Sequence, residues 1–220
     1  MSSREDILAR VRQKLGRNET NAAVARAEID TVLAAKAQGP RPQVDAEKSA
    51  LVGRLIDKSR AYSSTVDQVA TRGEAPAAIA RYLIGLGLPA QAVIWPKLAD
   101  LDWASAGVIV QARAAQDADL VGITGCFCAV AETGTLMLCG SVDSPAAISL
   151  LPETHIAIVP ASRIVPGMEE AFALARKELG QLPRAVNFIS GPSRTGDIEQ
   201  TIVLGAHGPY RVHLILIDGA

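Results

Sequence analysis

The residues that could do chemistry are densest in 189–209, ISGPSRTGDIEQTIVLGAHGP, which holds serine, threonine, acid and histidine side chains. A serine-hydrolase triad would use Ser193, Asp197 and His207. The motif does not fit, because GPSRTG lacks the G-x-S-x-G spacing of a nucleophile elbow. The apolar run at 198–204 also predicts a helix, which would hold His207 about 10 Å from Ser193 at 1.5 Å per residue. A local triad is therefore geometrically poor.

The same stretch is more typical of an anion-binding loop. If a helix spans 198–204, Asp197 is its N-cap and Gly205 ends it, so structure alone explains these two residues. The polar loop Ser193-Arg194-Thr195 is not explained in this way. Backbone N–H groups at a helix N-terminus bind carboxylates and phosphates, and Arg194 could add a bidentate contact. Because Asp197 already occupies the positive end of the helix dipole, a bound anion would depend on the loop N–H groups, the two hydroxyls and the guanidinium.

A second candidate lies in AVAETGTLMLCGS, residues 129–141. Glu132 would stand between a helix and a very apolar strand, where a carboxylate is costly unless it is paired or functional. It could act as a general base or as a nucleophile, with hydroxyls from Thr124 and Thr133 beside it. The structural alternative is a carboxylate that accepts hydrogen bonds from loop N–H groups.

Two histidines and three cysteines are further candidates for reactive side chains. His155 opens a predicted strand and His207 stands in AHGP, so each could transfer protons or serve as a structural donor. The spacing of Cys126, Cys128 and Cys139 fits neither a zinc site nor an iron–sulfur cluster. We expect all three to be small buried apolar residues, and we expect neither a metal nor a cofactor in this chain.

The elements that must position these residues alternate along the chain. Helices are predicted at 45–62, 74–87, 119–132, 167–179 and 198–204, and strands at 65–70, 92–96, 107–110, 134–139, 155–160, 185–190 and 211–217. Such alternation predicts an α/β domain with a mostly parallel sheet covered by helices on both faces. Residues 1–43 are expected to form a helical appendage and linker, and residues 44–220 the α/β domain. GLGLPA at 85–90 follows a helix and precedes a strand, which is the reverse of a dinucleotide-binding turn.

Composition limits the possible partners. The 220 residues are 49% hydrophobic and carry a net charge of −1, and only 4% are aromatic. The chain lacks the basic excess that binds phosphates and the aromatic residues that stack on bases, so we expect no nucleic acid as partner. The polar start MSSREDILAR differs from a signal peptide, and no apolar run approaches the ~20 residues of a membrane helix. We expect a cytoplasmic protein without a membrane span.

Three segments together resemble the LUD-domain family, and within it the lactate-utilisation protein C subgroup. They are GITGCFCAVAETGTLMLCGS, LLPETHIAIVPASRIV and ISGPSRTGDIEQTIVLGAHGP, and the similarity extends over about 45–218. The resemblance implies a three-layer α/β/α fold like that of sugar-phosphate isomerases and CoA transferases. Its signature positions correspond to Glu132, Thr133, Gly134, Thr135, His155, Ser193, Thr195, Asp197, Glu199 and His207.

The resemblance also implies a role in bacterial oxidation of L-lactate to pyruvate, with iron–sulfur lactate-utilisation subunits as partners. Lactate oxidation passes electrons to a flavin, a nicotinamide or a metal centre, and the motifs of this chain supply none of these sites. We therefore expect an accessory or small-acid-binding subunit, with the iron–sulfur clusters in the partner subunits. The alternative is an enzyme like the CoA transferases or sugar-phosphate isomerases, which would use Glu132 and hold a thioester or a phosphorylated sugar at 191–197.

Overall fold

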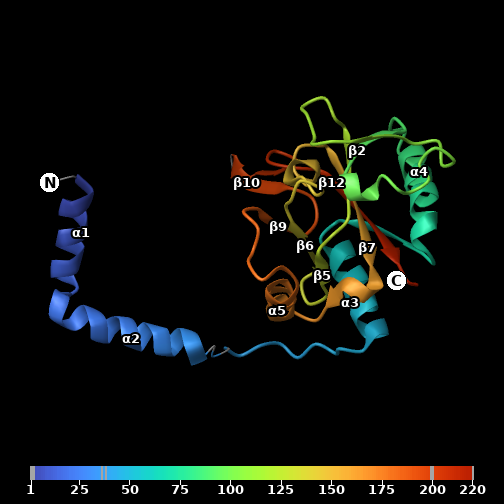
Figure 1. The fold of residues 1–220 in the computed structure, drawn as a ribbon. Helices are drawn as coiled ribbons and strands as arrows, with labels where there is room; N and C mark the ends of the chain where they lie inside the picture. The colour runs from blue at the N-terminus through green and yellow to red at the C-terminus, as the bar shows by residue number, and fades with distance from the viewer. Residues whose placement is uncertain (1–2, 36, 38, 199–200, 220) are drawn as a thin grey trace. The chain divides into compact units, whose positions relative to one another are not determined.

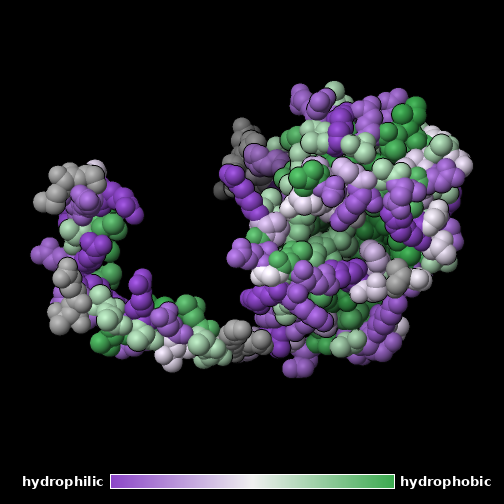
Figure 2. All heavy atoms as spheres, in the orientation of Figure 1, coloured by the Kyte–Doolittle hydropathy of each residue, from purple (hydrophilic) through white to green (hydrophobic). Residues whose placement is uncertain are grey.

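The computed structural model describes residues 3–35, 37, 39–198 and 201–219, and it forms two compact units, Met1–Gln43 and Val44–Ala220. The first unit consists of helices α1 (Ser3–Lys14) and α2 (Glu19–Ala35). Large apolar side chains on both helices are exposed, among them Ile7, Val11, Ile29 and Leu33. Figure 2 shows hydrophobic and hydrophilic residues side by side on these helices. Among the described residues of this unit Ala25 is buried, while these large apolar side chains stay outside any core.

A six-stranded parallel sheet forms the centre of the second unit (Figure 1). Its order is β1 (Thr65–Val69), β12 (Arg211–Ile217), β7 (Thr154–Pro160), β4 (Val121–Thr124), β2 (Gln91–Ile94) and β3 (Ile109–Ala112). The inner strands are continuous apolar runs because both of their faces are buried. Helices α3 (Lys48–Ala61) and α4 (Ala75–Gly85) pack against the sheet region. The predicted α/β class with a mostly parallel sheet is confirmed.

A smaller sheet carries much of the chemistry-bearing sequence. Its order is β8 (Ile164–Val165), β5 (Cys128–Val130), β6 (Thr135–Cys139) and β9 (Val186–Ile189). Helix α5 (Met168–Leu179) packs on it through Ala171 and Ala175, which join Cys128, Val130 and Met137 in a separate apolar cluster. Strands β10 (Arg194–Ile198) and β11 (Thr201–Leu204) form a third, two-stranded sheet.

Most predicted elements are confirmed, but the helix predicted at 119–132 is wrong. This segment forms strands β4 and β5, and all four residues of β4 are buried between neighbouring parallel strands. A short apolar run does not distinguish a buried strand from a buried helix by periodicity alone. The correction places Glu132 in the turn between β5 and β6 rather than at a helix end.

The helix predicted at 198–204 is also wrong. Arg194 pairs with Leu204 and Thr195 pairs with Val203 in an antiparallel hairpin. The β-branched run Thr201-Ile202-Val203 favours a strand. Asp197 therefore lies within β10 and caps no helix, so the helix N-terminus predicted to bind an anion is replaced by a strand.

Two details follow from this hairpin. Gly205, at φ +78, lies in the turn after β11 instead of ending a helix. Glu199, a signature position, lies outside the described residues.

In the described part of the chain, no helix combines the length and the apolar character needed to cross a membrane.

Candidate functional site

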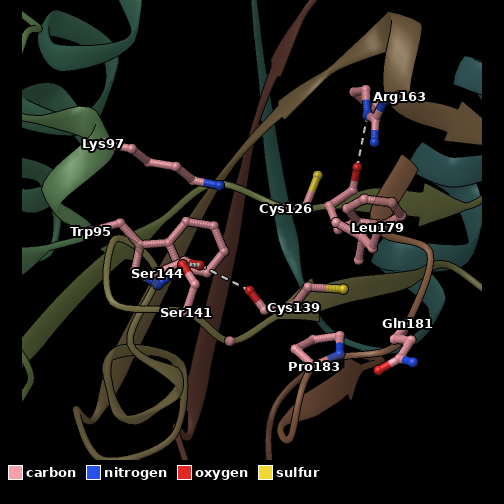
Figure 3. Close-up of a pocket in the computed structure, with 12 residues that line it drawn as sticks. Trp95, Lys97, Cys126, Cys139, Ser141, Ser144, Arg163, Leu179, Gln181 and Pro183 are labelled. Atoms are coloured by element: carbon pink, nitrogen blue, oxygen red, sulfur yellow. Dashed lines mark hydrogen bonds between the residues drawn. The ribbon is translucent and has the colours of Figure 1, made fainter. Parts of the chain in front are cut away.

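A pocket of about 610 Å³ opens at the carboxyl edge of the central sheet (Figure 3). Three neighbouring parallel strands supply residues just beyond their carboxyl ends: Trp95 and Lys97 follow β2, Cys126 follows β4, and Arg163 follows β7. Cys139, the last residue of β6, lies on the opposite wall. Ligands of parallel α/β proteins bind at this edge, and the volume is within the range of small-molecule sites.

Lys97 extends its ammonium group into the pocket (Figure 3). Its Nζ lies 4.3 Å from the centroid of the Trp95 ring. The indole is almost fully buried and donates from Nε1 to the Pro145 carbonyl oxygen at 3.1 Å. A Cβ on Gly125 would lie 3.4 Å from this ring and 3.8 Å from Lys97 Cε, so the glycine keeps this wall open.

The ammonium group of Lys97 has no ion-pair partner in the part of the chain that the structure describes. Among residues 3–35, 37, 39–198 and 201–219, none forms a hydrogen bond or ion pair with its ammonium group. The residue is exposed, but burial of part of its side chain lowers the pKa of Lys97 below its ordinary value. The lack of a described partner and the exposure make Lys97 accessible to a ligand.

Arg163 is already engaged within the protein. Its two terminal nitrogens donate to the Glu178 carboxylate at 2.7 and 2.9 Å, and its Nε donates to the Phe127 carbonyl oxygen at 2.8 Å. The carboxylate of Glu178 raises the pKa of Arg163. The guanidinium also lies over the Phe127 ring, 4.9 Å from its centroid. Arg163 therefore forms a fixed wall whose charge is largely balanced.

The thiols in and beside the pocket are weak nucleophiles. Cys126 and Cys139 are half-buried on the pocket wall, whereas Cys128 is fully buried beneath the small sheet. Burial raises the pKa of Cys126 and of Cys128 to about 12, and it also raises the pKa of Cys139. Such thiols stay protonated near neutral pH. The prediction of a small buried residue fits Cys128, while Cys126 and Cys139 contact the pocket.

Glu132, Thr133, Gly134 and Thr135 lie at the far end of the β5–β6 hairpin. Four steps along β6 separate Thr135 from Cys139, which is about 13 Å at 3.3 Å per residue. Gly134 has φ +63, and a Cβ there would lie 2.7–2.9 Å from atoms of Lys58 and Ser59 in α3. The hairpin turn thus needs glycine both for its backbone conformation and for its fit against α3.

Hydroxyl groups connect this turn to the 190–194 loop. Thr135 Oγ1 lies 2.8 Å from Thr133 Oγ1 and 2.6 Å from Ser190 Oγ. The half-buried Glu132 donates its N–H to the Pro166 carbonyl oxygen, and its Oε2 would lie 3.3 Å from a Cβ on Gly167. None of these side chains lines the 610 Å³ pocket.

The 190–194 loop meets the same end of α3. Gly191, at φ +81, approaches the Tyr62 carbonyl oxygen so closely that a Cβ would lie 2.3 Å from it. Arg194 donates to Ser63 Oγ. The Ser193 N–H donates to the Pro209 carbonyl oxygen, which anchors the loop to the turn before β12. The fold therefore gathers two signature segments beside the end of α3, away from the pocket.

The histidine candidates occupy two further places. His155 Nε2 lies 2.8 Å from Thr124 Oγ1, and both residues are fully buried within the central sheet. Burial lowers the pKa of His155 to about 4, so its ring is neutral near pH 7. His207 is exposed in the turn after β11. The described candidates from the sequence therefore do not share one pocket.

Sequence reasoning missed Trp95, Lys97 and Arg163. The sequence contained a usable signal. Trp95 and Lys97 lie at the end of the strand predicted at 92–96, and Arg163 lies three residues after the strand predicted at 155–160. Residues at the carboxyl ends of parallel strands are the usual ligand contacts of an open α/β sheet. Because 119–132 was predicted as a helix, the same argument could not identify Cys126 as a residue that follows a parallel strand.

Comparisons with known proteins give a consistent set of relatives. A family model described as LUD domain matches residues 8–217. Lactate utilization protein C of Bacillus licheniformis is 37% identical over 120 residues, which cover 53% of this chain and 50% of that protein. The Bacillus subtilis (strain 168) protein of the same name is 44% identical over 101 residues, covering 44% and 42%. These alignments thus span half or less of the curated relatives' length.

One solved structure extends the comparison to the fold. A DUF162 family protein from Deinococcus radiodurans is 26% identical and superposes with a TM-score of 0.60. The match covers 79% of this chain and 100% of that one.

Proposed function

Because the chain belongs to the LUD-domain family, we propose that it is a component of lactate utilisation. Its role would be that of an accessory, small-acid-binding subunit in a bacterial system that oxidises L-lactate to pyruvate. The names of the Bacillus relatives support the part in lactate utilisation. Lactate oxidation passes electrons to a flavin, a nicotinamide or a metal centre, and the proposal assigns that step to iron–sulfur partner proteins.

The observation that carries the acid-binding part is the ammonium group of Lys97 in the pocket. Lactate and pyruvate each carry one carboxylate, and an ammonium without an ion pair can bind it by a charge-assisted hydrogen bond. The Trp95 ring and the half-buried thiols of Cys126 and Cys139 provide an apolar surround. Partial exclusion of water by this surround strengthens the attraction between the two charges.

Isothermal titration calorimetry tests acid binding directly. We expect the full chain to bind L-lactate and pyruvate, and we expect Lys97→Ala to abolish the heat of binding. Lys177→Ala is the matched control, because Lys177 is exposed on α5 and outside the pocket. No binding of either acid at millimolar concentration would remove the acid-binding role.

The cellular role needs a separate test. The chain would replace Lactate utilization protein C in Bacillus subtilis, with growth on L-lactate as the readout and co-purification of iron–sulfur proteins as the second measurement. We expect both growth and co-purification. Loss of growth without any co-purifying iron–sulfur protein would count against the accessory role.

A further inference from the structure

The pocket contains one good candidate nucleophile. The thiols of Cys126 and Cys139 are held protonated by burial, which raises their pKa. The amine of Lys97 is affected in the opposite direction, because burial lowers its pKa and so favours the neutral form with a free electron pair. A lysine that is partly desolvated beside apolar groups is a typical nucleophile toward carbonyl carbon.

We propose that Lys97 Nζ condenses with the carbonyl group of a 2-oxo acid held in this pocket and forms an imine. The neutral amine attacks the carbonyl carbon, and a C=N double bond replaces the C=O double bond. The two amine protons leave with the carbonyl oxygen as one water molecule, so no oxidant or reductant is needed. The inference rests on the proposed function, which supplies pyruvate as the 2-oxo acid.

The surroundings of Lys97 suit this chemistry. The Trp95 ring, at 4.3 Å from Nζ, shields one side of the amine. The charged and titratable groups that affect the pKa of Lys97 are Cys126, Cys139, Arg163 and Asp143. Burial lowers the pKa of Lys97 most strongly, Cys126 and Cys139 raise it, and Arg163 lowers it. Asp143 acts in the other direction, but it forms no ion pair with Lys97 among the described residues.

The imine gives the pocket a chemical basis for selectivity. Pyruvate has a carbonyl group next to its carboxylate, whereas L-lactate has a hydroxyl group at that carbon. Only the oxidised acid can therefore be held covalently, although both can pair with a cation. A subunit with this property would retain the product of lactate oxidation and release the substrate.

Reductive trapping tests the proposal. The full chain is incubated with pyruvate and sodium cyanoborohydride, and the product is analysed by intact mass and peptide mapping. We expect a single reduced pyruvyl adduct at Lys97 and no adduct with L-lactate. Lys97→Arg keeps the positive charge but cannot form the adduct, whereas Lys177→Arg should be labelled like the parent. Intrinsic tryptophan fluorescence checks that both variants are folded.

Other labelling results count against the imine, and two combined outcomes separate it from the proposed function. A label spread evenly over surface lysines, or one retained in Lys97→Arg, would overturn it. If calorimetry shows binding of both acids and no adduct is trapped at Lys97, the imine is wrong while the proposed function stands. If Lys97 is trapped but the chain fails to support growth on L-lactate, the imine stands and the proposed function fails.

Discussion

Gly134→Ala gives the sharpest test of how the signature turn fits against α3. The residue has φ +63, a conformation that costs an alanine about 1–2 kcal/mol. A new Cβ would also lie 2.7 Å from Lys58 Cβ and 2.9 Å from both Lys58 C and Ser59 N. Two of these contacts are with helix backbone, so relief requires the turn or α3 to move. Overpacking of this kind costs about 1–3 kcal/mol more.

Gly87→Ala is the matched control, since Gly87 has φ +65 and open space around its Cβ position. We expect Gly87→Ala to lower the free energy of unfolding by about 1–2 kcal/mol and Gly134→Ala to lower it by about 2–5 kcal/mol. The assay is urea unfolding followed by tryptophan fluorescence, because Trp95 and Trp103 are both buried in the second unit. Equal losses in the two variants would refute the reasoning that the turn is fixed against α3.

Three further predictions concern the core, the pocket wall and the hydroxyl contacts. The folded-state pKa of His155, about 4, lies below its ordinary 6.5, so the unfolded chain binds the proton first as pH falls. We expect the free energy of unfolding to drop by up to about 3 kcal/mol between pH 6.5 and 4 from this ring, and His155→Gln to reduce that dependence in urea unfolding; an unchanged pH dependence would count against it. Glu178→Gln should release Arg163 and tighten pyruvate binding in calorimetry, at a stability cost of about 1 kcal/mol or less because the pair is partly exposed; an unchanged affinity would show that Arg163 does not face the acid. Thr135→Val should cost about 1–3 kcal/mol by breaking its contact with Ser190, yet leave acid affinity unchanged; weaker acid binding would place the ligand near this turn instead.

Much of the second unit could be predicted from local sequence. Apolar runs such as HIAIVP and RVHLILI become the strands β7 and β12 at the centre of the sheet, where burial on both faces requires continuous apolar sequence. The helix predicted at 74–87, with glycines as stop signals, forms as α4. In these segments local preference and tertiary packing agree.

The errors arose where an apolar run was short. VGIT and TIVL are four residues long, and periodicity does not separate helix from strand over that length. Pairing with distant strands decided both cases, and such pairing is not visible in one sequence. The helix predicted at 198–204 also supplied the helix N-terminus of the predicted anion site, and the hairpin has no such terminus.

The pocket was missed for a related reason. Lys97 and Arg163 look like ordinary charged residues in the sequence, and only the order of parallel strands brings them to one edge. The signature residues Glu132 and Ser193 are predicted as site residues because carboxylates and hydroxyls are common in catalytic and binding sites. Their backbone N–H groups donate hydrogen bonds that hold a turn and a loop in place, and the length of β6 separates the Glu132 turn from the pocket.

The most direct test of acid binding in this pocket is a crystal structure of the chain grown with pyruvate. We predict electron density for the acid beside Lys97 Nζ, with the Trp95 ring on one side and the Arg163 wall opposite. Density for the acid at the Thr135 and Ser190 hydroxyls, with the pocket beside Lys97 empty, would contradict the account.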